Sequence, residues 1–100
     1  MFYIYILKSV TSDITYIGYC EDPSERLIQH NTKEEVTFAS KHKPWEMKAL
    51  FEAGTAADAV VLERFIKKQK SPKLMEKLMN PEFVPEGKLV SLVRVAVSKD

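Results

Sequence analysis

The chain has 100 residues, of which 45% are hydrophobic and 29% charged, as in a soluble single domain with one modest core. No run of about eighteen apolar residues is present and no signal peptide is expected, which argues against a membrane protein. The lone Cys20 cannot form an internal disulfide and lies outside any zinc-ligand spacing, so we expect a cytoplasmic protein without a structural zinc site.

The first third of the chain predicts a β-hairpin followed by a helix. Residues 2–8 are nearly all apolar and β-prone, which is typical of a buried strand, and residues 14–20 indicate a second, antiparallel strand after a turn. Asp22 then caps a helix in which Pro23 takes the first position and Glu25 completes a capping box. We expect this helix to end at about His30, with Asn31 in the left-handed conformation.

A third strand and two further helices are predicted downstream. After a loop over residues 31–44, apolar residues recur at every second position, which indicates a half-buried strand with this inward face: Trp45, Met47, Ala49 and Phe51. Gly54 ends the strand. Capping patterns then predict a helix over residues 55–69 and a shorter one over residues 71–80.

The valine-rich tail is the ambiguous segment. Leu89 and Leu92 suit a helix, whereas the β-branched residues among 88–97 favour a strand, which is the preferred interpretation. The elements follow the order β-β-α-β-α-α plus a tail, which predicts an α+β fold with a small three-stranded antiparallel sheet flanked by helices. We expect residues 1–80 to form the domain and residues 81–100 to pack on it.

Charge is distributed unevenly although the net charge is only +1. Residues 21–35 are mainly acidic, whereas residues 64–77 carry six bases against Glu76 alone, and Lys41 to Lys43 add a short basic stretch. Basic patches of this kind can contact a phosphate backbone. A solvated helix face is the alternative interpretation.

Glu63 is an unusual residue for its place in the predicted helix. It lies four residues after Ala59 and three before Ile66, along the stripe that faces the core. Burying an unpaired carboxylate costs several kcal/mol (order of magnitude), so this one must be paired or bound to a metal ion. Pairing with Lys67, one turn later, is the structural alternative to a metal site.

Two strand tyrosines and two residues of the first helix are the other candidates for chemistry. Tyr5 and Tyr16 could simply pack, because tyrosine is common in strands. A phenol with a pKa of about 10 becomes a useful base only where positive charge stabilises the phenolate. Arg26 and His30 lie four apart on one helix face and can supply such charge or hold a phosphate. Gly18 indicates a place where the backbone comes close to another group.

Five sequence elements in order resemble the catalytic core of the GIY-YIG endonucleases. They are Tyr3-Ile4-Tyr5, Tyr16-Ile17-Gly18, Arg26, His30-Asn31 and Glu63. The resemblance covers residues 2 to about 79 and is nearest to small stand-alone members related to the nuclease domain of excinuclease C. It departs at Tyr3, where the family has its first glycine, and at Tyr19, where some relatives have a lysine.

The resemblance implies a metal-dependent endonuclease that hydrolyses DNA phosphodiester bonds. In it, Tyr16 would be the general base, Tyr5 would position the attacking water, and Arg26 would neutralise charge on the phosphate. His30 would shuttle a proton or hold a phosphate oxygen, and Glu63 would bind one Mg²⁺ or Mn²⁺ ion, a hard cation suited to oxygen ligands.

The residues expected to contact DNA are Gly18, Asn31, Lys41, Lys43, Lys67 and Lys68. Two alternatives stay open. The departures at Tyr3 and Tyr19 also suit a DNA-binding module that has lost turnover, and the valine-rich tail also suits an interaction protein. A separate protein partner that targets the chain to its substrate is a further possibility, because 100 residues leave little room for a reader domain.

Overall fold

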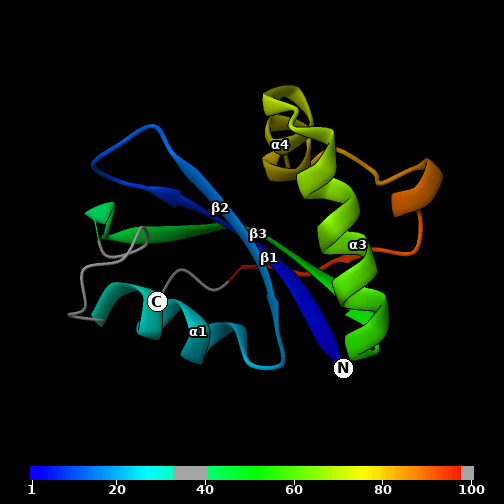
Figure 1. Cartoon of the computed structure of the whole chain (residues 1–100), viewed down its shortest axis with the longest axis horizontal. Coiled ribbons are helices and arrows are strands. Elements are labelled where there is room, and N and C mark those ends of the chain that lie inside the picture. The colour runs from blue at the N-terminus through cyan, green and yellow to red at the C-terminus, as the bar shows by residue number, and fades with distance from the viewer. Residues whose placement is uncertain (33–40, 98–100) are drawn as a thin grey trace.

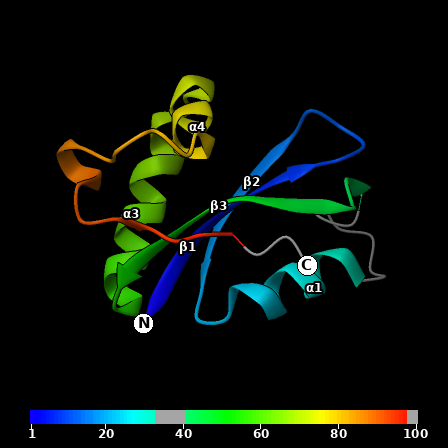
Figure 2. The same cartoon turned by 180° about the vertical axis from the view of Figure 1, so that it is seen from behind.

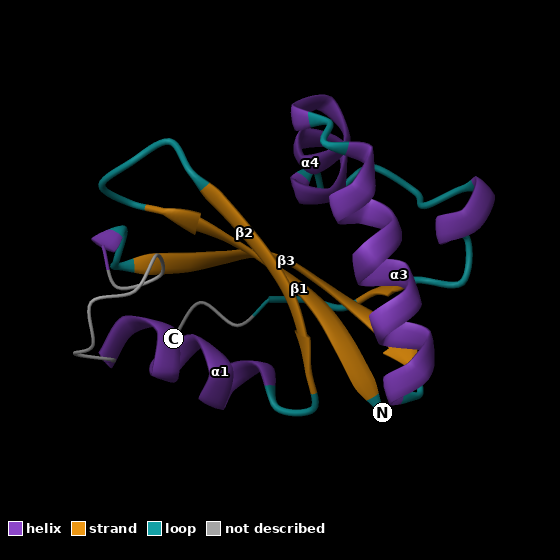
Figure 3. Cartoon of the chain, viewed as in Figure 1, coloured by secondary structure: helices purple, strands orange, loops and turns teal. Residues whose placement is uncertain are grey.

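The computed structural model describes residues 1–32 and 41–97 (Figures 1 and 3). In chain order the elements are β1 (Phe2–Ser9), β2 (Thr15–Cys20), α1 (Pro23–Thr32), β3 (Trp45–Gly54), α3 (Ala56–Gln69), α4 (Pro72–Met79), the 3-10 turn η1 (Gly87–Leu89) and β4 (Val93–Arg94). Within these two ranges, none of the helices has the length and apolar character needed to cross a bilayer. Positions 33–40 of the predicted loop and acidic stretch, and positions 98–100 of the tail, lie outside the described residues.

The strands form one antiparallel sheet in the order β2-β1-β3-β4. The α+β fold class is therefore confirmed, and the sheet has four strands where three were predicted, because a short part of the tail strand joins it as β4. β1 lies between β2 and β3, and its residues from Ile4 to Leu7 are at most 2% exposed. β2 is an edge strand, so side chains beside it are accessible to a substrate that approaches this edge of the sheet.

Helices cover both faces of the sheet, with α1 on one side and α3 and α4 on the other (Figures 1 and 2). The side of α3 and α4 holds the larger core cluster, which includes Ile4, Ile6, Ile17, Phe51, Ile66 and Leu78. The side of α1 holds a smaller cluster built on Tyr5, Leu7, Cys20, Trp45 and Leu50. Alternation along β1 and β2 therefore sends Tyr5 and Tyr16 to the same side as α1.

Local capping sets the helix starts as predicted. The Glu25 backbone N–H donates to the Asp22 carboxylate at 3.1 Å, and Thr55 and Asp58 form a reciprocal capping box at the start of α3. The predicted end of α1 is wrong: the helix continues to Thr32, and Lys70 is the one described non-glycine residue with a positive φ. Asn31 stays helical because its side chain binds the backbone of β3 instead.

β3 confirms the predicted strand but corrects its one-sided face. Its register against β1 shifts between Ile6 and Leu7, which pair with Ala49 and Met47, so that Lys48 is an extra residue. The shift reverses the alternation along the strand. Trp45 and Met47 therefore pack on the side of α1, whereas Ala49 packs in the larger cluster on the other side.

The tail forms less strand than predicted. β4 contains two residues, which pair with β3, and the preceding segment is the 3-10 turn η1. Leu89 and Leu92, spaced for a turn, are buried in the larger cluster. Arg94 fixes the tail: its guanidinium lies 4.7 Å from the Phe51 ring centroid and donates to carbonyl oxygens of Leu78 and Asn80 at the end of α4.

Candidate active site at the edge of β2

Two phenols and an imidazole meet on the side of the sheet covered by α1. The Tyr5 hydroxyl is 3.2 Å from His30 Nε2, at hydrogen-bonding distance. The Tyr5 and Tyr16 rings stack at 6.3 Å between centroids, and the Tyr16 and His30 rings meet edge-on at 4.8 Å. The central strand, the edge strand and α1 each contribute one member, so three residues far apart in the sequence form one polar cluster.

Gly18 makes room for this cluster. It lies directly opposite Tyr5 in the register of β1 and β2. A Cβ atom at position 18 would lie 2.4 Å from the Tyr5 hydroxyl oxygen and 2.6 Å from its Cζ, closer than real contacts allow. The absent side chain therefore lets the Tyr5 phenol extend across the edge strand, which explains the close backbone approach expected at this glycine.

Burial and neighbouring charges act together on the Tyr5 phenol. Burial raises its pKa well above the usual value, and Tyr16 raises it further, whereas the Arg26 guanidinium lowers it. The Glu63 carboxylate makes a smaller contribution that also raises this pKa. Tyr5 is therefore protonated at neutral pH, and both Arg26 and Glu63 lie within electrostatic reach of its hydroxyl.

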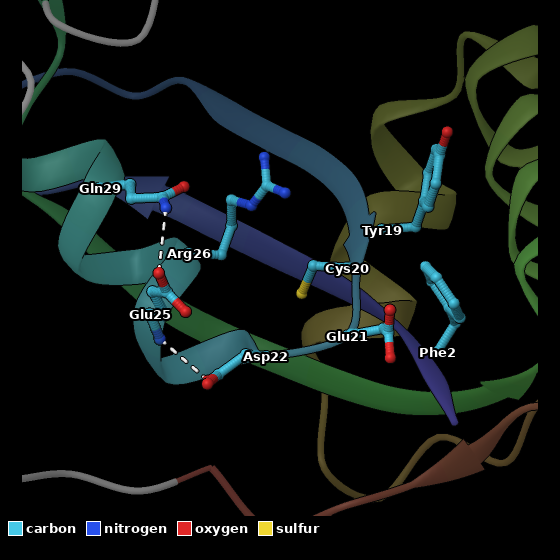
Figure 4. Close-up of a pocket in the computed structure, with 8 residues that line it drawn as sticks. All are labelled: Phe2, Tyr19, Cys20, Glu21, Asp22, Glu25, Arg26 and Gln29. Carbon is cyan, nitrogen blue, oxygen red and sulfur yellow. Dashed lines mark hydrogen bonds between the residues drawn. The ribbon is translucent and has the colours of Figure 1, made fainter.

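Arg26 lies on the exposed surface of α1, one turn before His30, and lines a cavity of about 360 Å³ (Figure 4). The other wall of this cavity carries the rings of Tyr19 and Phe2. The turn between β2 and α1 adds Glu21 and Asp22. The cavity therefore places a guanidinium, which suits a phosphate, beside the polar cluster.

Glu63 is buried, as predicted, and it has the lysine partner given as the alternative to a metal ion. It is 7% exposed within the core-facing stripe of α3, and its Oε1 atom lies 2.8 Å from Lys67 Nζ. Its oxygen donors fit Mg²⁺, which proteins often hold through one carboxylate together with substrate phosphates and water. Within residues 1–32 and 41–97, Glu63 does not belong to any group of three or more potential metal ligands.

The structure brings three of the five predicted catalytic residues into direct contact and leaves the other two at a greater distance. Tyr5, Tyr16 and His30 are in direct contact. Arg26 and Glu63 approach from helices on opposite faces of the sheet and act on Tyr5 through their charges. Across residues 1–32 and 41–97, the recorded hydrogen bonds and ion pairs do not connect either of them to a tyrosine.

Asn31 and Trp45 play a part that sequence reasoning missed. The Trp45 backbone N–H donates to Asn31 Oδ1 at 2.6 Å, and Asn31 Nδ2 donates to the Trp45 carbonyl at 3.1 Å. The buried Trp45 ring lies 6.1 Å from the Tyr16 ring and 6.5 Å from that of His30. The amide of Asn31 thus fixes the end of α1 to β3 and sets the position of the neighbouring His30. In the sequence, the only indication of this role was that Asn31 directly follows the candidate residue His30.

The four lysines expected to contact DNA come from two different parts of the chain. Lys67 and Lys68 are exposed in the last turn of α3, although Lys67 is also the partner of Glu63. Lys41 is exposed and Lys43 half-buried in the segment that precedes β3. A DNA backbone bound at the candidate site would have to reach both pairs of lysines.

Comparison with known proteins adds a family match. The sequence model of the family described as the GIY-YIG catalytic domain matches residues 1–77. The chain is also similar to structure-specific endonuclease subunit SLX1 from two strains, JEC21 and B-3501A, of Cryptococcus neoformans var. neoformans serotype D. Identity to each is 39% over 51 residues, which is 46% of this chain and 10% of the relative. The chain thus matches about a tenth of the length of these curated relatives.

Proposed function

Because the chain belongs to the GIY-YIG family of endonucleases, we propose that it is a metal-dependent endonuclease that hydrolyses DNA phosphodiester bonds. One observation carries this proposal. Tyr5, Tyr16 and His30 are in mutual contact beside the edge strand β2, where Gly18 leaves room for the Tyr5 phenol. The charges of Arg26 on α1 and Glu63 on α3 both act on that phenol.

We assign the general base to Tyr16 and the positioning of water to Tyr5. The raised pKa of Tyr5 keeps its proton in place, so Tyr5 is suited to donate a hydrogen bond and not to remove a proton. Tyr16 would take a proton from the attacking water in its phenolate form. His30, whose ring meets that of Tyr16 edge-on at 4.8 Å between centroids, would shuttle the proton or hold a phosphate oxygen.

Charge on the phosphate would be met by Arg26 and by a cation at Glu63. The planar guanidinium can donate two hydrogen bonds to one phosphate group. A divalent ion, Mg²⁺ or Mn²⁺, held by Glu63 would supply Lewis-acid stabilisation of that charge. Lys67 must then share or release the carboxylate, and because Glu63 is buried the cation would have to replace Lys67 as its partner.

Nicking of supercoiled plasmid DNA in the presence of Mg²⁺ tests the assignment. We expect Tyr16→Phe and Glu63→Gln each to lower the rate by about 10²-fold or more, the usual size of a lost acid–base or electrostatic contribution. Val84→Ala, at a side chain that is 76% exposed, is the matched control and should nick as the unmodified chain does. Full activity in either site variant would show that the assignment is wrong.

A DNA-binding module without turnover is the second candidate. The ion pair of Glu63 with Lys67 favours it, because the carboxylate has a partner without any metal ion. Purified protein that shifts DNA in a gel but does not nick it with Mg²⁺ or Mn²⁺ would establish this alternative. Nicking that disappears in Tyr16→Phe would exclude it.

We further propose that a protein partner or an additional segment raises the affinity for DNA. The net charge of +1 predicts weak non-specific binding, with a Kd of about a micromolar or more at physiological salt. The relatives carry the word subunit in their name, which describes those proteins. Nanomolar binding of plain duplex DNA by the isolated chain would contradict this proposal.

A further inference from the structure

One wall of the cavity beside Arg26 is aromatic and has no role in the proposed binding of phosphate. Phe2 and Tyr19 form this wall, with ring centroids 6.4 Å apart and planes inclined by 45°. Tyr19 is 37% exposed, and Figure 4 shows both rings across the cavity from the guanidinium. The geometry points to a subsite for one unpaired nucleobase of the DNA strand whose phosphate lies at Arg26. This inference rests on the proposed function.

Stacking is the first reason. Aromatic side chains at the surface of nucleic-acid-binding proteins hold unpaired bases by stacking on their faces, whatever the base. A base inside a duplex is stacked on its neighbours and cannot reach such a ring. The Tyr19 and Phe2 wall therefore requires a base that is already unpaired or that leaves the stack.

The charge of the lining is the second reason. Glu21, Asp22 and Glu25 line the cavity together with Arg26, so three carboxylates accompany one guanidinium. A phosphate backbone running through the cavity would be repelled except at Arg26, whereas a base is uncharged. Carboxylates accept hydrogen bonds from the exocyclic amine of cytosine, and thymine lacks that donor.

The local fold keeps the carboxylates at this place. Asp22 caps α1 by accepting from the Glu25 backbone N–H at 3.1 Å, and Glu25 Oε1 lies 3.5 Å from Gln29 Nε2. Glu21 lies in the turn directly after β2 and carries the third carboxylate. We therefore assign the contact with the base amine to Glu21, and the stacking to Tyr19.

Two consequences follow for the substrate. The chain should prefer DNA with at least one unpaired nucleotide next to the scissile phosphate over a continuous duplex. At that nucleotide it should prefer cytosine to thymine. Both preferences arise from contacts between the base and the lining of the cavity. They should therefore be measurable in DNA binding as well as in cleavage.

The test measures binding with 2-aminopurine as the base probe. A short duplex with a single unpaired 2-aminopurine and the same duplex fully paired are titrated with the full chain in EDTA, so that no cleavage occurs. We expect quenching of the unpaired probe and tighter binding of that duplex. Tyr19→Leu should abolish the quenching and weaken binding of the unpaired duplex about 5- to 150-fold, the value of stacking one base. Tyr19→Phe, which keeps the ring, should retain the quenching.

The outcomes separate this inference from the proposed function. Equal affinity for the two duplexes, or equal loss for both in Tyr19→Leu, would overturn the base subsite even if the chain nicks DNA. Quenching that depends on Tyr19 would support the subsite even if neither the unmodified chain nor Tyr16→Phe nicks DNA. An unpaired cytosine bound no better than an unpaired thymine would overturn the assignment of Glu21.

Discussion

Gly18→Ala isolates the spatial relation on which the candidate site depends. The new Cβ atom would lie 2.4 Å from the Tyr5 hydroxyl oxygen, 2.6 Å from Cζ and 3.1 Å from Cε1. Bringing the nearest pair to an ordinary contact distance requires a shift of about 1 Å in the Tyr5 ring or in β2. Tyr5 is 2% exposed, so the ring has little room to move within the core.

The expected losses follow from that displacement. Forcing an additional methyl group into a packed core costs about 1–3 kcal/mol of unfolding free energy, or about 4–24 °C in Tm for a domain of this size. A displacement of about 1 Å would also lengthen the 3.2 Å contact between Tyr5 and His30. Misplacing a reacting group by that distance costs about 10²-fold in rate.

Thermal unfolding by circular dichroism and plasmid nicking with Mg²⁺ measure the two losses. Gly87→Ala is the control: its φ is +62° and no atom lies within 4 Å of the added Cβ, so it should lose about 1–2 kcal/mol through backbone strain without a matching loss of rate. A second check is Gly18→Ala in a Tyr5→Leu background, where the cost of the added methyl group should largely disappear. If Gly18→Ala unfolds at the same temperature as the unmodified chain, or above it, the placement of the Tyr5 phenol across β2 is wrong.

Two further predictions concern the same side of the sheet. Because burial raises the pKa of Tyr5 in the folded state, the unfolded chain loses this proton first, so the unfolding free energy should fall as the pH rises above about 10, by up to about 1.4 kcal/mol per pH unit. Urea unfolding between about pH 8 and 11 measures this slope, which Tyr5→Phe should reduce; parallel slopes would refute the reasoning. Asn31→Leu removes both hydrogen bonds to the Trp45 backbone and should cost about 1–3 kcal/mol in urea unfolding at neutral pH, with Asn31→Asp intermediate because it keeps the acceptor. A change below about 0.5 kcal/mol in Asn31→Leu would show that these bonds do not hold α1 to β3.

The features that sequence reasoning predicted well are those set by neighbouring residues. Asp22, Thr55 and Ser71 start helices because each side chain accepts a backbone N–H three residues later. Glu63 was predicted to be buried from the spacing of Ala59 and Ile66 alone.

The features that were missed depend on contacts between distant segments. The extra residue Lys48 in β3 reflects the register with β1, and nothing within residues 45–54 announces it. The strand predicted within residues 88–97 is only two residues long, because its pairing depends on how much of the edge of β3 is exposed. The role of Asn31 depends on where the start of β3 lies in space, so the local preference of asparagine for helix ends gave the wrong answer.

The two halves of the candidate site rest on supports of different stiffness. Tyr5 belongs to β1, whose buried residues are expected to open together with the whole domain, whereas α1, which carries Arg26 and His30, contains no buried residue. On warming, amide hydrogens of α1 should therefore exchange with solvent well before those of β1. Arg26, one turn before the end that Asn31 holds to β3, can therefore adjust to a substrate more readily than the Tyr5 phenol, which is fixed in the core.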